Sequence, residues 1–115
     1  MKRDLELIRV LLLEVEGKAT IQPQKLNAPG FSPDQVDYHV DLLIDAGYLM
    51  NGYRMAGGTL PTVLTWVGHE FLDATRNDTI WQKVKTTLKD RGIEAPLSVI
   101  QQLATQIAAG MLGLS

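Results

Sequence analysis

The stretch SPDQVDYHVDLLIDAG, residues 32–47, decides the fold. Ser32, followed by Pro33 and by Gln35 three positions on, has the pattern of a helix N-cap with a capping box. Gly47 provides a left-handed stop, so we predict a helix from Pro33 to about Ala46. Apolar residues at helical spacing form its expected buried side: Val36, Val40, Leu43 and Ile44.

Another helix is expected earlier in the chain, from about Asp4 to Glu16. Its apolar residues run almost all the way round, which predicts burial on two sides. Pro23 and Pro29 interrupt the segment between the two helices. There we expect at most a short strand at residues 19–21 and a turn or two of helix near residues 24–27.

Two strand-like segments follow the helix that begins at Pro33. They are Tyr48–Met50 and Val63–Thr65, and the twelve residues between them include three glycines and a proline. This arrangement predicts a β-hairpin with a long tip. Because a helix, a glycine stop and a hairpin come in this order, we predict a winged helix-turn-helix domain over residues 1–76.

Three further helices are expected, beginning at Trp66, near Asp78 and at Pro96. The last two form a helical C-terminal extension over residues 77–115. We expect this extension to pack on the winged-helix domain or on a dimer partner. The predicted fold class is therefore mainly α with a small β-hairpin.

The composition limits the kinds of function. A chain of 115 residues with 45% hydrophobic content suits one ordinary domain. Its 11 basic and 13 acidic residues give no overall attraction for nucleic acid or anionic membranes. The absence of cysteine excludes disulfides, thiolate nucleophiles and cysteine-based zinc sites. Charged residues within the first apolar stretch argue against a signal peptide, so we expect a cytoplasmic protein.

Four stretches resemble a known family: MKRD with LIR (residues 1–9), YHV with LL and AG (residues 38–47), LTW with GHEFLDA (residues 64–74) and WQKVK (residues 81–85). They are similar to a bacterial and prophage-associated family, domain of unknown function 2513, over nearly the whole chain. The resemblance implies a winged-helix fold, a bacterial or phage origin and no established activity. Members of the family tend to have lysines in the final helix, whereas this chain has no charged residue after Glu94. That difference argues against ion-paired or nucleic-acid roles for this helix.

The predicted helix from Pro33 has an acidic face formed by Asp34, Asp37, Asp41 and Asp45. In a winged helix-turn-helix this helix normally enters the major groove of DNA, but aspartates repel the phosphates there. A solvated face and a surface that recognises a basic protein partner are both better explanations. The candidate partner-binding residues are the four aspartates with Tyr38 and, at the hairpin tip, Tyr53, Arg54 and Met55. The alternative for the tip is a hairpin end without function.

A DNA-binding transcriptional regulator is the alternative function. In that case Arg54, Lys83, Lys85, Lys89 and Arg91 would contact the phosphate backbone without reading its sequence. An ordinary solvated face explains the four cations of the extension at least as well.

Catalytic and metal sites are not expected. His39 faces away from the aspartates and is predicted to be packed in the core. His69 and Asp73 are four residues apart, but two residues without a third ligand are weak evidence for zinc. We find no activated nucleophile and no phosphate-binding loop, so we predict no enzymatic activity and no cofactor.

The last predicted helix has an uncharged apolar stripe: Ile100, Leu103, Ala104, Ile107, Ala108 and Met111. Four glutamine and threonine residues on its other side argue against a membrane span, so no membrane association is expected. We expect a homodimer, with this stripe and Leu11 at the interface, or an intrachain contact between the same helices. The sequence therefore favours a dimeric regulator or accessory factor that acts by binding.

Overall fold

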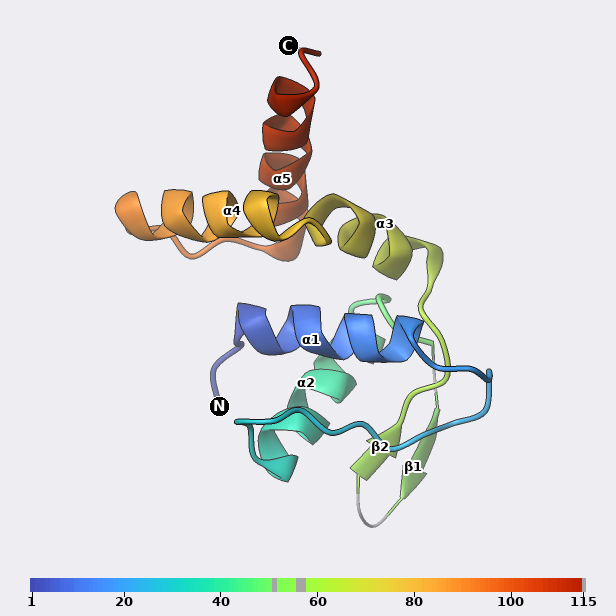
Figure 1. The fold of residues 1–115 in the computed structure, drawn as a ribbon. Helices are drawn as coiled ribbons and strands as arrows, with labels where there is room; N and C mark the ends of the chain where they lie inside the picture. The colour runs from blue at the N-terminus through green and yellow to red at the C-terminus, as the bar shows by residue number, and fades with distance from the viewer. Residues whose placement is uncertain (51, 56–57, 115) are drawn as a thin grey trace. The chain divides into compact units, whose positions relative to one another are not determined.

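The computed structural model describes residues 1–50, 52–55 and 58–114 (Figure 1). Asn51, Ala56 and Gly57, which belong to the expected hairpin tip, and Ser115 lie outside the described residues. The chain divides into two units, Met1–His69 and Glu70–Ser115. This division falls inside a helix, seven residues before the boundary expected after residue 76. Each unit is described by itself below.

Helix α1, Leu5–Glu16, begins within one residue of the predicted start and is capped by Asp4. The Asp4 carboxylate accepts a hydrogen bond from the Leu7 backbone N–H at 3.0 Å. The side chains buried on α1 are Leu7, Ile8, Leu11, Leu12 and Val15. Most of its apolar side chains are therefore buried, whereas Leu5, Val10 and Leu13 are half-buried.

The segment between α1 and α2, residues 17–32, has no helix or strand. The prediction of a short strand at residues 19–21 and of a helical turn near residues 24–27 is therefore wrong. The Lys18 ammonium donates hydrogen bonds to the carbonyls of Gln22, Pro61 and Thr62, and the Gln24 N–H donates to the Pro61 carbonyl at 3.2 Å. The segment is thus held by contacts with a distant part of the chain and not by its own regular structure.

Helix α2, Pro33–Asp45, has the predicted capping box, in which the Ser32 and Gln35 side chains each accept from the other's backbone N–H. Gly47 follows with a φ of 82°, as its left-handed stop requires. The buried residues on α2 are Val36, His39, Val40 and Leu43. Together with α1 they provide most of the core of the first unit.

The hairpin consists of β1, Tyr53–Met55, and β2, Gly58–Leu60, paired antiparallel. The predicted strands form only its base, where Leu49 and Leu64 make an isolated bridge. The regular pairing lies closer to the tip than expected. The observed fold class is nevertheless the predicted one, mainly helical with a small β-hairpin, and its element order is consistent with a helix-turn-helix and wing.

The other helices are α3, Trp66–Thr75, α4, Asp78–Asp90, and α5, Leu97–Met111. Helix α4 begins at Asp78, as predicted, and Asn77 caps it by accepting from the Ile80 N–H at 3.0 Å. In the second unit α4 packs against α5, and the buried side chains include Trp81, Val84 and Ile100. None of the helices in the described part of the chain is long and apolar enough to cross a membrane.

Candidate protein-interaction surface

The four aspartates of α2 divide into two pairs with different surroundings. Asp37 forms an ion pair with Lys25, with 2.8 Å between Nζ and Oδ1. Asp41 accepts a hydrogen bond from the Thr59 hydroxyl at 2.5 Å and lies 3.5 Å from the Arg54 guanidinium. This pair therefore joins α2 to the preceding segment and to the hairpin.

Gly58 allows the hairpin to lie close to α2. It has a φ of 119°, and a Cβ atom added to it would overlap the Asp37 carboxylate. Only glycine combines this backbone conformation with so close an approach. Asp37 thus has a packing role in addition to its ion pair.

The strand register separates the three tip residues that the sequence placed together. Arg54 is paired with Thr59, and both reach Asp41 on α2. Because side chains alternate along a strand, Tyr53 and Met55 point to the other face of the hairpin. They are 68% and 60% exposed, so this outer face presents an aromatic ring and a thioether to solvent.

The other aspartate pair, Asp34 and Asp45, is exposed. Neither carboxylate has an ion pair or a hydrogen bond among the described residues. Tyr38 lies on the same side of α2, half-buried, with its ring edge-on to His39 at a centroid distance of 5.7 Å. We call Asp34, Tyr38 and Asp45 the free face of α2.

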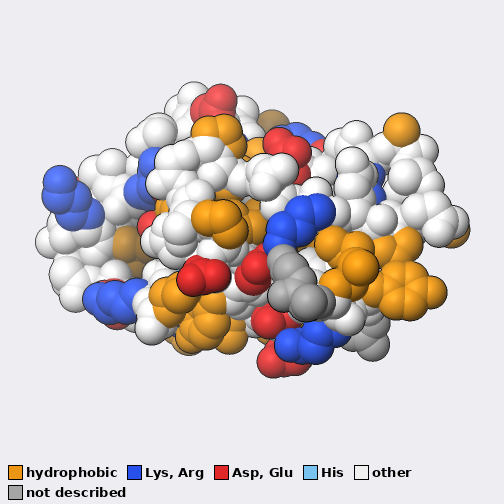
Figure 2. Space-filling model, turned by 90° about the horizontal axis from the view of Figure 1, so that it is seen from below, with side chains coloured by type: hydrophobic (Ala, Val, Ile, Leu, Met, Phe, Trp, Pro, Cys, Tyr) orange, Lys and Arg blue, Asp and Glu red, His pale blue; other side chains and the backbone are white. Residues whose placement is uncertain are grey.

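The charge balance at α2 stays negative. Lys25 and Arg54 offset two of the four aspartates, which leaves a balance of −2 for these six residues. Figure 2 shows acidic, basic and hydrophobic side chains gathered on the side of the molecule that carries the hairpin. The surface is therefore mixed, with an acidic excess, and not uniformly acidic.

The candidate phosphate-contacting residues are spread over both units. Lys83, Lys89 and Arg91 are exposed and Lys85 is half-buried, all in or just after α4 of the second unit. Arg54 belongs to the first unit and is engaged by Asp41. The structure thus does not bring these five cations together within one unit.

The candidate dimer residues differ in accessibility. Leu11, Ile100 and Ala104 have no exposed surface. Leu103, Ile107 and Ala108 are half-buried, and Met111 is 52% exposed. Met111, at the end of the predicted stripe, is therefore its most accessible residue, and Leu103, Ile107 and Ala108 are partly accessible.

The histidines do not form a metal site among the residues described. His39 is 1% exposed and hydrogen-bonded within the fold, as its predicted core position requires. His69 is exposed, and the Asp73 carboxylate accepts from Arg76 at 2.8 Å. No group of three or more potential ligands is found in the described part of the chain.

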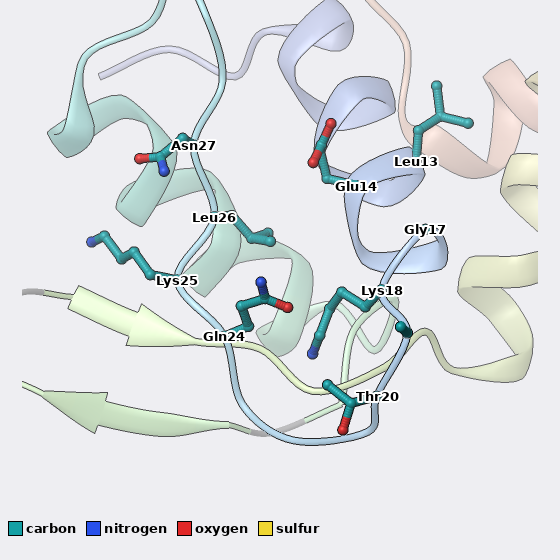
Figure 3. Close-up of a pocket in the computed structure, with 10 residues that line it drawn as sticks. Leu13, Glu14, Gly17, Lys18, Thr20, Gln24, Lys25, Leu26 and Asn27 are labelled. Carbon is teal, nitrogen blue, oxygen red and sulfur yellow. The ribbon is translucent and has the colours of Figure 1, made fainter.

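An open groove of about 690 Å³ lies between the end of α1 and the segment after it (Figure 3). Gln24 and Lys18 extend toward each other in it, while Lys25 points away. Burial lowers the pKa of Lys18, whose ammonium is already taken by three carbonyls. Lys18 and Lys25, the two cations of the groove, therefore stabilise the fold. The sequence did not indicate this role of Lys18, because two of its three partners are backbone carbonyls more than 40 residues away.

Comparison with known proteins identifies the family of this chain. The family described as Hypothetical protein (DUF2513) matches residues 2–94, and the chain belongs to this family. A Haemophilus influenzae protein described as an uncharacterized protein is 36% identical over 121 residues, covering 97% of this chain and 99% of that protein. No solved structure gives a significant match. The family predicted from the sequence is confirmed, and α5 lies beyond the matched residues.

Proposed function

We propose that this chain acts by binding and not by catalysis, as a regulator or accessory factor of prophage type. Its ligand is a protein with a basic surface. The contact is made by the free face of α2 together with Tyr53 and Met55 on the outer face of the hairpin. The observation that carries this proposal is the exposure of Asp34 and Asp45 after Asp37 and Asp41 have found partners.

The chemistry of these residues suits a protein ligand. Aromatic rings and methionines are enriched in protein interfaces, where they bury large areas. Exposed carboxylates steer a basic partner toward the surface and fix its orientation more than they add affinity. A surface that combines Tyr53 and Met55 with two exposed aspartates offers both kinds of contact.

DNA binding by a winged helix-turn-helix is the second candidate. The ion pairs of Asp37 and Asp41 favour it, since they halve the acidic charge at α2. The cations of α4 would then hold the phosphate backbone. We prefer the protein ligand because the remaining balance of −2 still opposes the approach of phosphates.

Fluorescence anisotropy with two labelled probes tests the choice. The probes are a random-sequence DNA duplex and an oligolysine peptide, each titrated at low and at moderate salt. Protein recognition predicts binding of the peptide and none of the duplex. Duplex binding that weakens steeply as salt rises would defeat the proposal.

The variant Asp34→Asn/Asp45→Asn should weaken peptide binding, since it removes the two exposed charges. Glu14→Gln/Asp90→Asn is the matched control, because it removes two exposed charges elsewhere on the chain. Equal loss in both variants would show that only net charge matters. Asp37 and Asp41 are unsuitable for this purpose because their substitution also disturbs the hairpin.

A further inference from the structure

The apolar stripe of α5 is buried at the start of the helix and exposed at its end. Ile100 and Ala104 are completely buried, Ile107 and Ala108 are half-buried, and Met111 is 52% exposed. The other four lie four, seven, eight and eleven residues after Ile100, which places all five on one side of the helix. The exposed end is thus the continuation of a buried stripe and not a separate face.

The position of α4 explains this gradient. Within the second unit α4 packs against the first half of α5, and the second half of α5 projects beyond it (Figure 1). Leu112 and Leu114, which follow the helix, are 73% and 69% exposed. Apolar side chains therefore lie uncovered at the projecting end of this unit.

We infer that the projecting half of α5 pairs with the same segment of a second copy of this chain. The two helices run antiparallel about a two-fold axis near Ala108. Ile107 of each copy lies against Met111 of the other, and the small side chain of Ala108 lets the helices approach closely. The interface is independent of the proposed function because it uses neither α2 nor the hairpin.

The charge distribution favours a second copy as the occupant. A two-fold axis brings the same surface of each chain together, so that surface must be complementary to itself. Residues 95–114 contain no charged side chain. Two copies of the segment can therefore pack together without charge repulsion, whereas a charged partner would form no ion pair with it.

Leu11 is not part of this interface. It has no exposed surface in the chain, so the dimer surface expected from α1 and α5 together reduces to α5 alone. Cover of α5 by residues 1–69 of the same chain is the competing arrangement, and it predicts a monomer.

Sedimentation velocity of the full chain over a wide concentration range tests the pairing. The expected mass is twice the 12.7 kDa of one chain. Met111→Glu should raise the dissociation constant of the dimer at least about tenfold, because each copy then places a carboxylate in the apolar contact with Ile107 of the other. Gln102→Glu adds the same charge at an exposed position on the opposite side of α5 and should leave the dimer intact.

Three results would overturn the inference. They are a wild-type chain that stays monomeric at every concentration, a Met111→Glu variant that remains dimeric, and loss of the dimer in both variants alike. Circular dichroism of each variant confirms that α5 is still helical, so that misfolding is not mistaken for dissociation.

The absence of cysteine from the sequence allows a second, direct measurement. A residue near a two-fold axis lies close to its own copy, so Ala108→Cys should form an intermolecular disulfide under mild oxidation. Gln102→Cys, on the opposite side of the helix, should not. Equal cross-linking of the two variants would contradict the arrangement.

Discussion

The Nε2 atom of His39 accepts a hydrogen bond from the backbone N–H of Asp4 at 2.9 Å, although 35 residues separate them. The proton on Nδ1 is donated to the Gln35 carbonyl at 2.7 Å. The neutral imidazole therefore links α2 to the residue that caps α1. Because His39 is 1% exposed, both of its nitrogens depend on these partners.

Replacing His39 by leucine should destabilise the fold by about 1–3 kcal/mol, since the Asp4 N–H loses its acceptor in a partly buried position. Urea unfolding followed by circular dichroism measures the change. Tyr38→Phe is the control, because the Tyr38 hydroxyl has no hydrogen bond among the described residues. An equal effect of the two substitutions would contradict the role assigned to the imidazole.

Lys18→Met should loosen the segment after α1. Three carbonyls lose the ammonium that joins residue 22 to residues 61 and 62. The amide of Gln24, which donates to the Pro61 carbonyl, should then exchange its hydrogen at least about tenfold faster, as expected for a local opening eased by about 1.4 kcal/mol. Hydrogen exchange followed by NMR measures this rate. Lys83→Met, at an exposed position of α4, should leave it unchanged.

The stability of the protein should fall as the pH rises above about 10, because burial raises the pKa of Tyr48 above its ordinary value of 10.0. The folded state then keeps the phenol proton at a pH where the unfolded chain has lost it. The unfolded chain thus binds fewer protons, and alkali favours unfolding. Desolvation of Lys18 has the opposite effect on stability. Because burial lowers the pKa of Lys18, its contribution to stability increases as the pH rises from that lowered pKa to the ordinary value of 10.5.

Tyr48→Phe separates these two contributions. Denaturant unfolding of wild type and variant between neutral and alkaline pH should show a constant difference in stability below pH 9. Above pH 10 the wild type should lose stability relative to the variant. A difference that stays constant through the alkaline range would rule out the ionisation of Tyr48 as the cause.

Two glycine substitutions should act in opposite directions. Gly58→Ala should cost about 1–3 kcal/mol, because the left-handed backbone and the Asp37 carboxylate both resist a side chain there. Gly110→Ala, in α5 with open space around it, should stabilise by up to about 1 kcal/mol. Thermal unfolding of both variants measures the changes. A neutral Gly58→Ala would mean that the hairpin does not need its close contact with α2.

The sequence by itself determined the start of α1 and both ends of α2, because caps and glycine stops act between residues a few positions apart. Asp4 with Leu7, and Ser32 with Gln35, are such local pairs. The family and the fold class were likewise predictable from residue order.

Only the tertiary structure decided which aspartates remain free. Lys25 and Thr59 lie 12 and 18 residues from their aspartate partners, and their contacts depend on how the segment before α2 and the hairpin come back to the helix. Helical periodicity places four carboxylates on one face, but it carries no information about what packs against that face. The same reason explains Leu11 and Met111: the sequence identifies both as apolar, and only packing makes one a core residue and leaves the other exposed.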